Sequence, residues 1–203
     1  MNRQLDETSQ ALLTAAHKLL SEVGPDALTV RRIATEAGMS TMNVYSRFGG
    51  KDGVIDELYA DGYRRLIAAI EAVPASDQVA DEILTVARTY RQFALDNPTY
   101  YGIMFRSAIT GFEPSQDSVD LALGGLSSFV ERVRRGQDLE QLARFPGRDA
   151  TESAAWLWAT CHGLISLELD GVAQDHVSWP SIFEHGMQTA LAGLHPGVTA
   201  STN

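Results

Sequence analysis

The chain has 203 residues, enough to bury a hydrophobic core in one large domain or two small ones. Its single cysteine, Cys161, excludes an internal disulfide framework, and we expect this thiol to be buried and structural. No apolar run reaches the roughly 18–20 residues that span a bilayer, and the polar first ten residues lack the apolar core of a secretory signal. The sequence therefore predicts a cytoplasmic protein without a membrane partner.

The formal net charge of −10 is unevenly distributed. Residues 1–51 carry six basic and five acidic side chains, a balance of +1, whereas residues 52–203 carry ten basic and twenty-one acidic ones, a balance of −11. The total argues against a nucleic-acid partner, but the local balance decides which surface can approach an anion. The first fifty residues are free to do so.

Apolar residues recur at helical spacing along almost the whole chain, and no convincing run alternates as a strand would. The sequence therefore predicts an all-α fold. The expected helices span residues 8–23, 29–37, 40–47, 51–73, 79–95, 98–111, 115–136, 151–169 and 180–194. Residues 137–149 are expected to form a short helix or loop broken at Pro146-Gly147, and residues 195–203 a frayed tail.

Residues 29–47 have the spacing of a helix-turn-helix motif, in which a turn containing glycine sets two helices at a steep angle and the second enters the DNA major groove. The turn is Gly38-Met39-Ser40. The small core between the helices is expected to contain Ile33, Ala34, Ala37, Met39 and Val44. Most of the second helix then faces outward, although polar helical surfaces are often merely solvated and this geometry also occurs in proteins that do not bind DNA.

Residues 28–59, LTVRRIATEAGMSTMNVYSRFGGKDGVIDELY, closely resemble the DNA-binding module of the tetracycline-repressor (TetR) family. The family pattern has a Thr-capped helix, Ala-Gly at the turn, Tyr late in the recognition helix, and then Phe and Lys. The matching positions are Thr29, Ala37-Gly38, Tyr45, Phe48 and Lys51. The resemblance implies a bacterial, homodimeric transcriptional regulator without enzymatic activity, and we predict a repressor. Many family members carry more basic residues in the first and third helices, which predicts weaker binding here at physiological salt.

Three residues of this module are predicted to bind DNA phosphates. Lys51 lies beside the free N–H groups that open the fourth helix, a combination that suits an anion. Tyr45 occupies a position that contacts phosphate in the family, and Thr29 can donate to a phosphate on the other flank. Base reading is expected from Thr41, Met42, Asn43 and Ser46, with Arg31 and Arg47 as further contributors. Arginine suits guanine, asparagine suits adenine, and methionine can contact a thymine methyl group.

Residues 150–171 resemble one C-terminal subtype of the family, recognised by a Trp-His-Gly signature that corresponds to Trp158, His162 and Gly163. The resemblance implies a DNA-binding domain of residues 1–51 and a ligand-binding and dimerisation domain of residues 52–203. The last two helices of each copy would form a four-helix bundle. The predicted interface residues are Leu157, Cys161, Leu164, Ile165, Phe183, Met187 and Leu191. Because one short recognition helix covers few base pairs, a dimer on a pseudo-palindromic operator is expected.

Aromatic residues and methionine concentrated in residues 90–129 can line an apolar ligand pocket, although a stripe at helical spacing is more often plain core. His162 can donate to a ligand carbonyl, or it can be a satisfied residue of the core or interface. The predicted pocket residues are Tyr90, Phe93, Tyr101, Met104, Phe105, Trp158 and His162. The sequence does not identify the ligand. In this acidic part of the chain an anionic ligand would need an arginine to bind it, whereas a neutral or cationic apolar compound would not.

The sequence contains no GxSxG, Walker-type or HExxH motif and no defensible metal-ligand spacing, so neither an enzyme nor a cofactor is predicted. The leading hypothesis is a repressor released from its operator DNA by a small apolar molecule. Two alternatives stay open: a DNA-binding dimer of the same fold controlled without a small molecule, and a helical interaction module.

Overall fold

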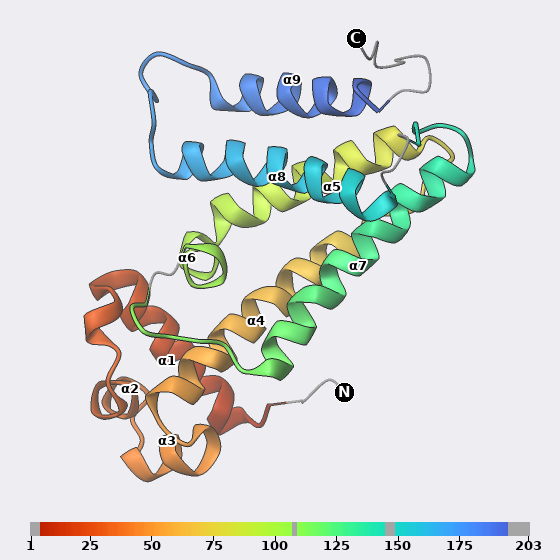
Figure 1. Cartoon of the computed structure of the whole chain (residues 1–203). Helices are drawn as coiled ribbons and strands as arrows, with labels where there is room; N and C mark the ends of the chain where they lie inside the picture. Colours follow the sequence, from red (N-terminus) through yellow and green to blue (C-terminus); the bar gives the residue numbers. More distant parts are fainter. Residues whose placement is uncertain (1–4, 107–108, 145–148, 195–203) are drawn as a thin grey trace. The chain divides into compact units, whose positions relative to one another are not determined.

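The computed structural model describes residues 5–106, 109–144 and 149–194, and every regular element in these ranges is helical (Figure 1). The all-α prediction is confirmed. The helices are α1 (Glu7–Val23), α2 (Val30–Glu36), α3 (Thr41–Phe48), α4 (Lys51–Glu71), α5 (Val79–Asp96), α6 (Pro98–Phe105), α7 (Gln116–Asp138), α8 (Ala150–Leu169) and α9 (Trp179–Ala192), with a short 3-10 turn at Pro25–Ala27. None of the described helices is both long and apolar enough to cross a membrane.

Most helix ends lie within two residues of the predicted ones, because local capping signals determine them. The exception is α6, which was expected to continue to Gly111 but ends at Phe105. Gly111 lies instead in a separate turn, where the N–H of Phe112 donates to the carbonyl of Ile109 and Gly111 adopts φ +77°. The predicted break at Pro146-Gly147 and the tail 195–203 lie outside the described residues.

The chain packs into two compact units, residues 1–65 with 97–122 and residues 66–96 with 123–203. We call them the first and the second unit. Helices α4 and α7 contribute residues to both. The predicted division into residues 1–51 and 52–203 concerned function rather than packing, and it stays a prediction.

In the first unit, α1 packs against α2, α3 and α6. Ile33, Ala34 and Val44 are buried between the first three helices, as expected, whereas Ala37 and Met39 are only half-buried because they lie in the turn at the rim. A polar contact joins α6 to α4, where the Tyr100 hydroxyl donates to Asp61 at 2.7 Å.

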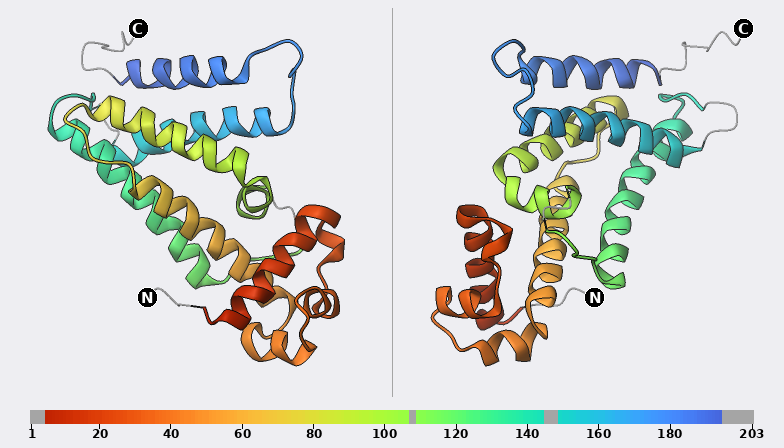
Figure 2. Two further views of the ribbon diagram at one scale, coloured as in Figure 1. Left: turned by 180° about the vertical axis from the view of Figure 1, so that it is seen from behind. Right: turned by 60° about the vertical axis from the view of Figure 1, so that its left-hand side comes forward.

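In the second unit, α8 and α9 run antiparallel and lie side by side in all views, and α5 packs against both (Figures 1 and 2). Their core is mostly apolar, although Ser153 of α8 is buried in it, and one carboxylate is buried near the start of α5. The Glu82 side chain is 0% exposed and accepts hydrogen bonds from the Ser76 N–H at 2.7 Å and from both Arg132 and Arg135. Arg132 also donates to the Ile70 carbonyl at 3.2 Å, so this cluster joins the last turn of α4 to α5 and α7.

Burial alone raises the pKa of Glu82, but the Ser76 N–H and the guanidinium groups of Arg135 and Arg132 outweigh it and hold the pKa below the ordinary value. The carboxylate is therefore charged at neutral pH, and its charge is matched by two arginines. A buried ion pair of this kind is costly to break from one side, because the partner charges stay behind without a counter-charge.

We therefore predict that Glu82→Gln lowers the free energy of unfolding by about 3 kcal/mol, because it leaves Arg132 and Arg135 without their shared counter-charge. Urea denaturation at a fixed protein concentration measures this loss. The matched control is Glu131→Gln, which removes an exposed carboxylate paired with Arg134 and should change stability by less than about 1 kcal/mol. Equal effects of the two substitutions would contradict the structural role of the Glu82 cluster.

Candidate nucleic-acid interface

The local sequence positions α2 and α3 through their caps. Thr29 is extended and its side-chain oxygen accepts a hydrogen bond from the Arg32 N–H at 3.3 Å, as the sequence predicts for an N-cap. Because a hydroxyl both accepts and donates, Thr29 can still donate to a phosphate. Ser40 takes the N-cap position of α3, but its hydroxyl oxygen accepts from the Asn43 side-chain amide at 3.2 Å rather than from the backbone.

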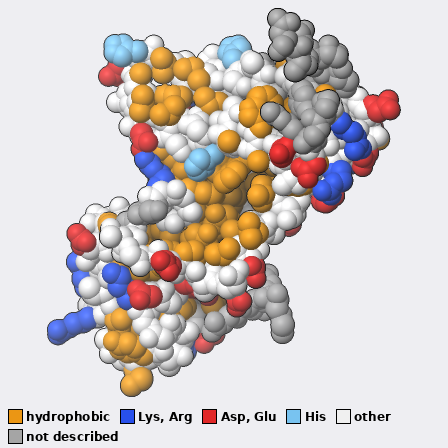
Figure 3. All heavy atoms as spheres, in the orientation of Figure 1, with side chains coloured by type: hydrophobic (Ala, Val, Ile, Leu, Met, Phe, Trp, Pro, Cys, Tyr) orange, Lys and Arg blue, Asp and Glu red, His pale blue; other side chains and the backbone are white. Residues whose placement is uncertain are grey.

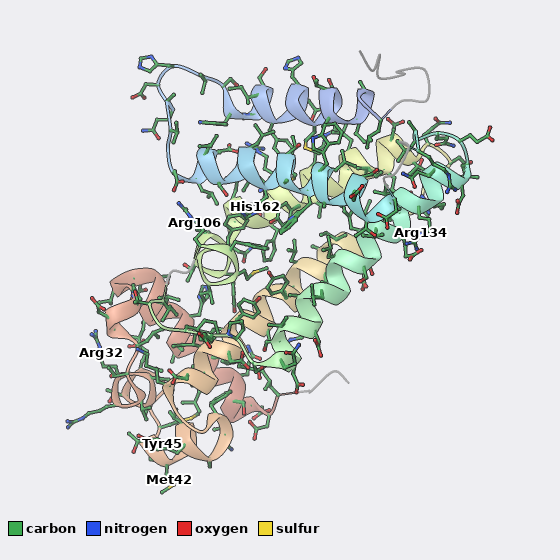
Figure 4. All side chains as sticks on the ribbon, in the orientation of Figure 1. Arg32, Met42, Tyr45, Arg106, Arg134 and His162 are labelled. Atoms are coloured by element: carbon green, nitrogen blue, oxygen red, sulfur yellow. The ribbon has the colours of Figure 1, made fainter. Side chains whose placement is uncertain are left out.

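Helix α3 exposes most of its surface and buries only Val44. Met42 is 69% exposed and Tyr45 54% exposed, and Figure 4 shows both projecting away from the ribbon of the first unit. Thr41 and Ser46 are exposed as well, whereas Asn43 and Arg47 are half-buried. An exposed tyrosine and methionine on one short helix form an apolar tip among polar groups, which suits contact with base edges and sugar-phosphate backbone.

The joint between α3 and α4 depends on glycine. Gly49 ends α3 in the left-handed conformation, with φ +73°, and donates its N–H to the Tyr45 carbonyl at 2.9 Å. At Gly53 an added Cβ would lie 1.8 Å from the carbonyl oxygen of Phe48, so only glycine fits. This contact brings Lys51, the first residue of α4, next to the end of α3. Lys51 is half-buried there.

Two of the residues predicted to read bases are held by contacts that the sequence analysis missed. Arg47 donates to the Asn43 side-chain oxygen at 3.2 Å and to both carboxylate oxygens of Asp6, at 3.3 and 3.2 Å. Asp6 is the N-cap of α1 and accepts from the Ser9 N–H at 2.7 Å. The spacing of Asp6 and Ser9 is a capping signal that the sequence displays, but nothing in it indicates the pairing with Arg47. Arg31, on α2, is exposed.

Comparison with known proteins gives the family. A family model described as bacterial regulatory proteins, tetR family, matches residues 12–58, and a model described as tetracyclin repressor-like, C-terminal domain, matches residues 83–190. The chain belongs to the TetR family. Its members are DNA-binding transcriptional regulators rather than enzymes, and the second matched span includes Trp158, His162 and Gly163.

Curated relatives and solved structures agree with this assignment. The chain is 23% identical over 192 residues to the HTH-type transcriptional regulator Rv1816 of Mycobacterium tuberculosis, covering 82% of each chain. The TetR family regulator PfmR of Thermus thermophilus superposes with a TM-score of 0.68 at 19% identity, over 91% of this chain and 98% of that one. The SmeT–triclosan complex superposes with a TM-score of 0.65 at 21% identity, over 98% and 99%. These two structures support the fold alone.

The predicted pocket residues fall into two groups, one in each unit. In the first unit, Tyr101 and Met104 are buried and the Tyr101 ring lies 5.0 Å from that of Phe105. In the second unit, Tyr90 and Phe93 are buried, and the Tyr90 hydroxyl lies 3.1 Å from Nδ1 of His162. The Trp158 ring is 5.6 Å from that of His162 on α8, whose position Figure 4 marks. Within the described ranges, no group of His, Cys, Asp or Glu could hold a metal ion.

The residues predicted for the dimer interface lie mostly inside the single chain. Leu164 is half-buried, and the other six are buried by the packing of α5, α8 and α9: Leu157, Cys161, Ile165, Phe183, Met187 and Leu191. The Cys161 thiol is buried, as expected, and burial raises its pKa to about 12. The opposite face of α8 carries the exposed apolar side chains Trp156 and Leu167.

The positions on α3 and α4 predict two kinds of DNA-binding defect. Tyr45→Phe and Lys51→Ala should weaken binding to every sequence about equally, and Lys51→Ala should also reduce the salt slope by about 1, because each loses a phosphate contact. Asn43→Ala should instead lower discrimination at one base pair by about tenfold or more, because a bidentate amide contact is lost. Fluorescence anisotropy on the operator, its single-base variants and a random duplex distinguishes the two. Uniform weakening by Asn43→Ala would contradict its base-reading role.

Proposed function

We propose that the protein is a homodimeric repressor that acts in the cytoplasm and whose two α3 helices read a pseudo-palindromic operator. We further propose that a small apolar molecule releases it. The observation that carries the proposal is the surface of α3, where Met42 and Tyr45 are exposed beside polar side chains. In the sequence this helix lies between the predicted phosphate contacts Thr29 and Lys51.

We assign phosphate contacts and base contacts to different residues of this surface. Tyr45, Thr29 and Lys51 would bind phosphates and set the position of α3 along the duplex without reading sequence. Thr41, Met42, Asn43 and Ser46 would meet the base edges. Because the half-sites of an operator are separated by about one turn of the double helix, two copies must present their α3 helices at a matching distance.

For the dimer we propose the exposed face of α8 in place of the buried residues first expected. Trp156, Ala159, Gly163 and Leu167 recur at spacings of three and four, so they share one side of the helix. Trp156 is 44% exposed and Leu167 46% exposed, with the small residues Ala159 and Gly163 between them. Figure 3 shows hydrophobic side chains gathered over α8 and α9. A second copy packed on this face would complete a four-helix bundle.

The proposed ligand control is supported by likeness of fold, since SmeT, which shares this fold, was solved in complex with triclosan. The two aromatic groups around Tyr101 and Tyr90 supply apolar surface of the kind that small-molecule sites use. A neutral ligand is favoured over an anion, because Arg88 and Arg91 already donate to Glu184 and Glu168 at 2.9 and 2.8 Å. If ligand weakens operator binding, the operator must weaken ligand binding by the same factor.

One observation favours the alternative of a dimer controlled without a small molecule. The polar groups that a ligand would use, the Tyr90 hydroxyl and His162, already contact each other. A ligand that used either group would have to replace this interaction.

The experiment that tests the function is selection of bound fragments from the source organism's genomic DNA at low and near-physiological salt. We expect recovery of a palindromic site, with weaker recovery at the higher salt because phosphate contacts are screened. Recovery of no sequence at either salt would contradict the proposal. Compounds related to the neighbouring genes are then added to the operator complex: release by one supports ligand control, and release by none favours the alternative.

The dimer is tested by Trp156→Asp, which should convert the protein to monomers in sedimentation equilibrium because it places a charge in the proposed interface. Operator affinity should fall with it, since one recognition helix covers few base pairs. The matched control is Leu139→Asp, which alters an apolar side chain that is 54% exposed just beyond α7. A dimer that survives Trp156→Asp, or that Leu139→Asp disrupts equally, would exclude this face as the interface.

A further inference from the structure

The carboxylate of Asp6 binds the only basic residue of the recognition helix. Arg47 is the one cation of α3, and its Nε and Nη2 donate to Oδ1 and Oδ2 of Asp6 at 3.3 and 3.2 Å. A fork of two parallel hydrogen bonds is the strongest arrangement between these groups. The two residues are 41 positions apart in the chain, so the contact joins the N-cap of α1 to the last turn of α3.

This contact occupies Arg47. Its remaining terminal nitrogen, Nη1, donates to the side-chain oxygens of Asn43 at 3.2 Å and Ser46 at 3.4 Å. The guanidinium is therefore neutralised by a carboxylate and engaged at all three nitrogens. Only 26% of the Arg47 side chain is exposed, compared with 60% for Asp6. Held in this way, Arg47 does not present a free fork to a guanine or a phosphate.

The same contact sets the orientation of the Asn43 amide. Because arginine only donates hydrogen bonds, the group of Asn43 that faces Arg47 must be its oxygen. The amide nitrogen then donates to the Ser40 hydroxyl oxygen at 3.2 Å. Each end of the amide keeps one hydrogen-bonding position, an acceptor on the oxygen and a donor on the nitrogen, and this pair matches adenine.

The Asp6 carboxylate is ionised at the pH at which DNA binding is measured. Its pKa is lowered to about 2 by hydrogen bonds from Ser9 and by Arg47. An exposed ion pair contributes little to stability, so its main consequence lies elsewhere.

We propose that Asp6 is a positioning residue for sequence selectivity, which withholds Arg47 from the DNA and fixes, through Arg47, the amide with which Asn43 reads a base. This inference rests on the proposed reading of DNA by α3. The carboxylate lowers affinity for phosphates in general and sharpens the preference for the operator.

The test is Asp6→Asn, which keeps an N-cap of equal quality while removing the charge. Freed from its partner, Arg47 becomes available to a phosphate, so affinity for a random duplex should rise about tenfold and the salt slope should steepen by about 1. Operator affinity should rise less, so the ratio of operator to random affinity should fall by about threefold or more, with the largest loss at the base pair read by Asn43. Fluorescence anisotropy with the dimer measures all three.

The matched control is Glu7→Gln, which removes the same charge from the next residue of the same helix end without touching the contact to Arg47. It should leave the operator-to-random ratio unchanged. A second experiment tests whether Asp6 acts through Arg47. In an Arg47→Met background, Asp6→Asn should change the ratio of operator to random affinity no more than Glu7→Gln does.

The outcomes separate this inference from the function on which it rests. If the wild-type protein selects an operator but Asp6→Asn and Glu7→Gln change the ratio equally, the role of Asp6 is overturned while the proposed function stands. If the wild-type protein prefers no sequence, both are overturned. A persistent effect of Asp6→Asn in the Arg47→Met background would overturn the route through Arg47.

Discussion

The direct contact of α4 with the end of α3 is the constraint on which the DNA-binding surface depends. At Gly53 there is no room for a side chain against the Phe48 carbonyl, so backbone meets backbone. With Val44 as its only buried side chain, α3 has little other anchorage of its own. The position of α3 is fixed by its caps, by the turn before it and by the glycine contact with α4, and not by a large buried surface. Its other side chains can therefore face outward. The first unit thus presents most of its third helix to a partner at small cost in burial.

The other end of α4 is held by charge rather than by close backbone packing. In the second unit, Arg132 donates hydrogen bonds both to the Ile70 carbonyl and to the buried carboxylate of Glu82. Glu82 also accepts a hydrogen bond from the backbone N–H of Ser76, which lies shortly before α5. Helix α4 is therefore anchored at its first turn by glycine and at its last by an ion cluster.

Features that depend on residues close together in the sequence could be predicted, whereas features that depend on distant residues could not. Most helix ends, the caps Thr29 and Ser40 and the outward residues of α3 depend on neighbours within four positions, and these were predicted, with the end of α6 as the exception. The buried face of α8 was not predicted. Apolar residues occupy several sides of this helix, so the spacing of apolar residues does not indicate which side packs against α5 and α9. Leu157 and Ile165 therefore proved to be core, whereas Trp156 stays exposed. The contact of Asp6 with Arg47 spans 41 positions, so no local pattern displays it.

The pairing of Asp6 with Arg47 also gives physical meaning to the charge balance. The first 51 residues have a net charge of only +1, and the sole cation of α3 is neutralised within the chain. Attraction to phosphates in general is thereby kept low, and non-specific binding consists almost entirely of that attraction. A regulator competes against a large excess of non-specific sites, so the ratio of affinities decides how much of it reaches its operator. Weak general affinity combined with an amide held in one orientation favours selectivity over strength, and this is consistent with an acidic protein that nevertheless reads DNA.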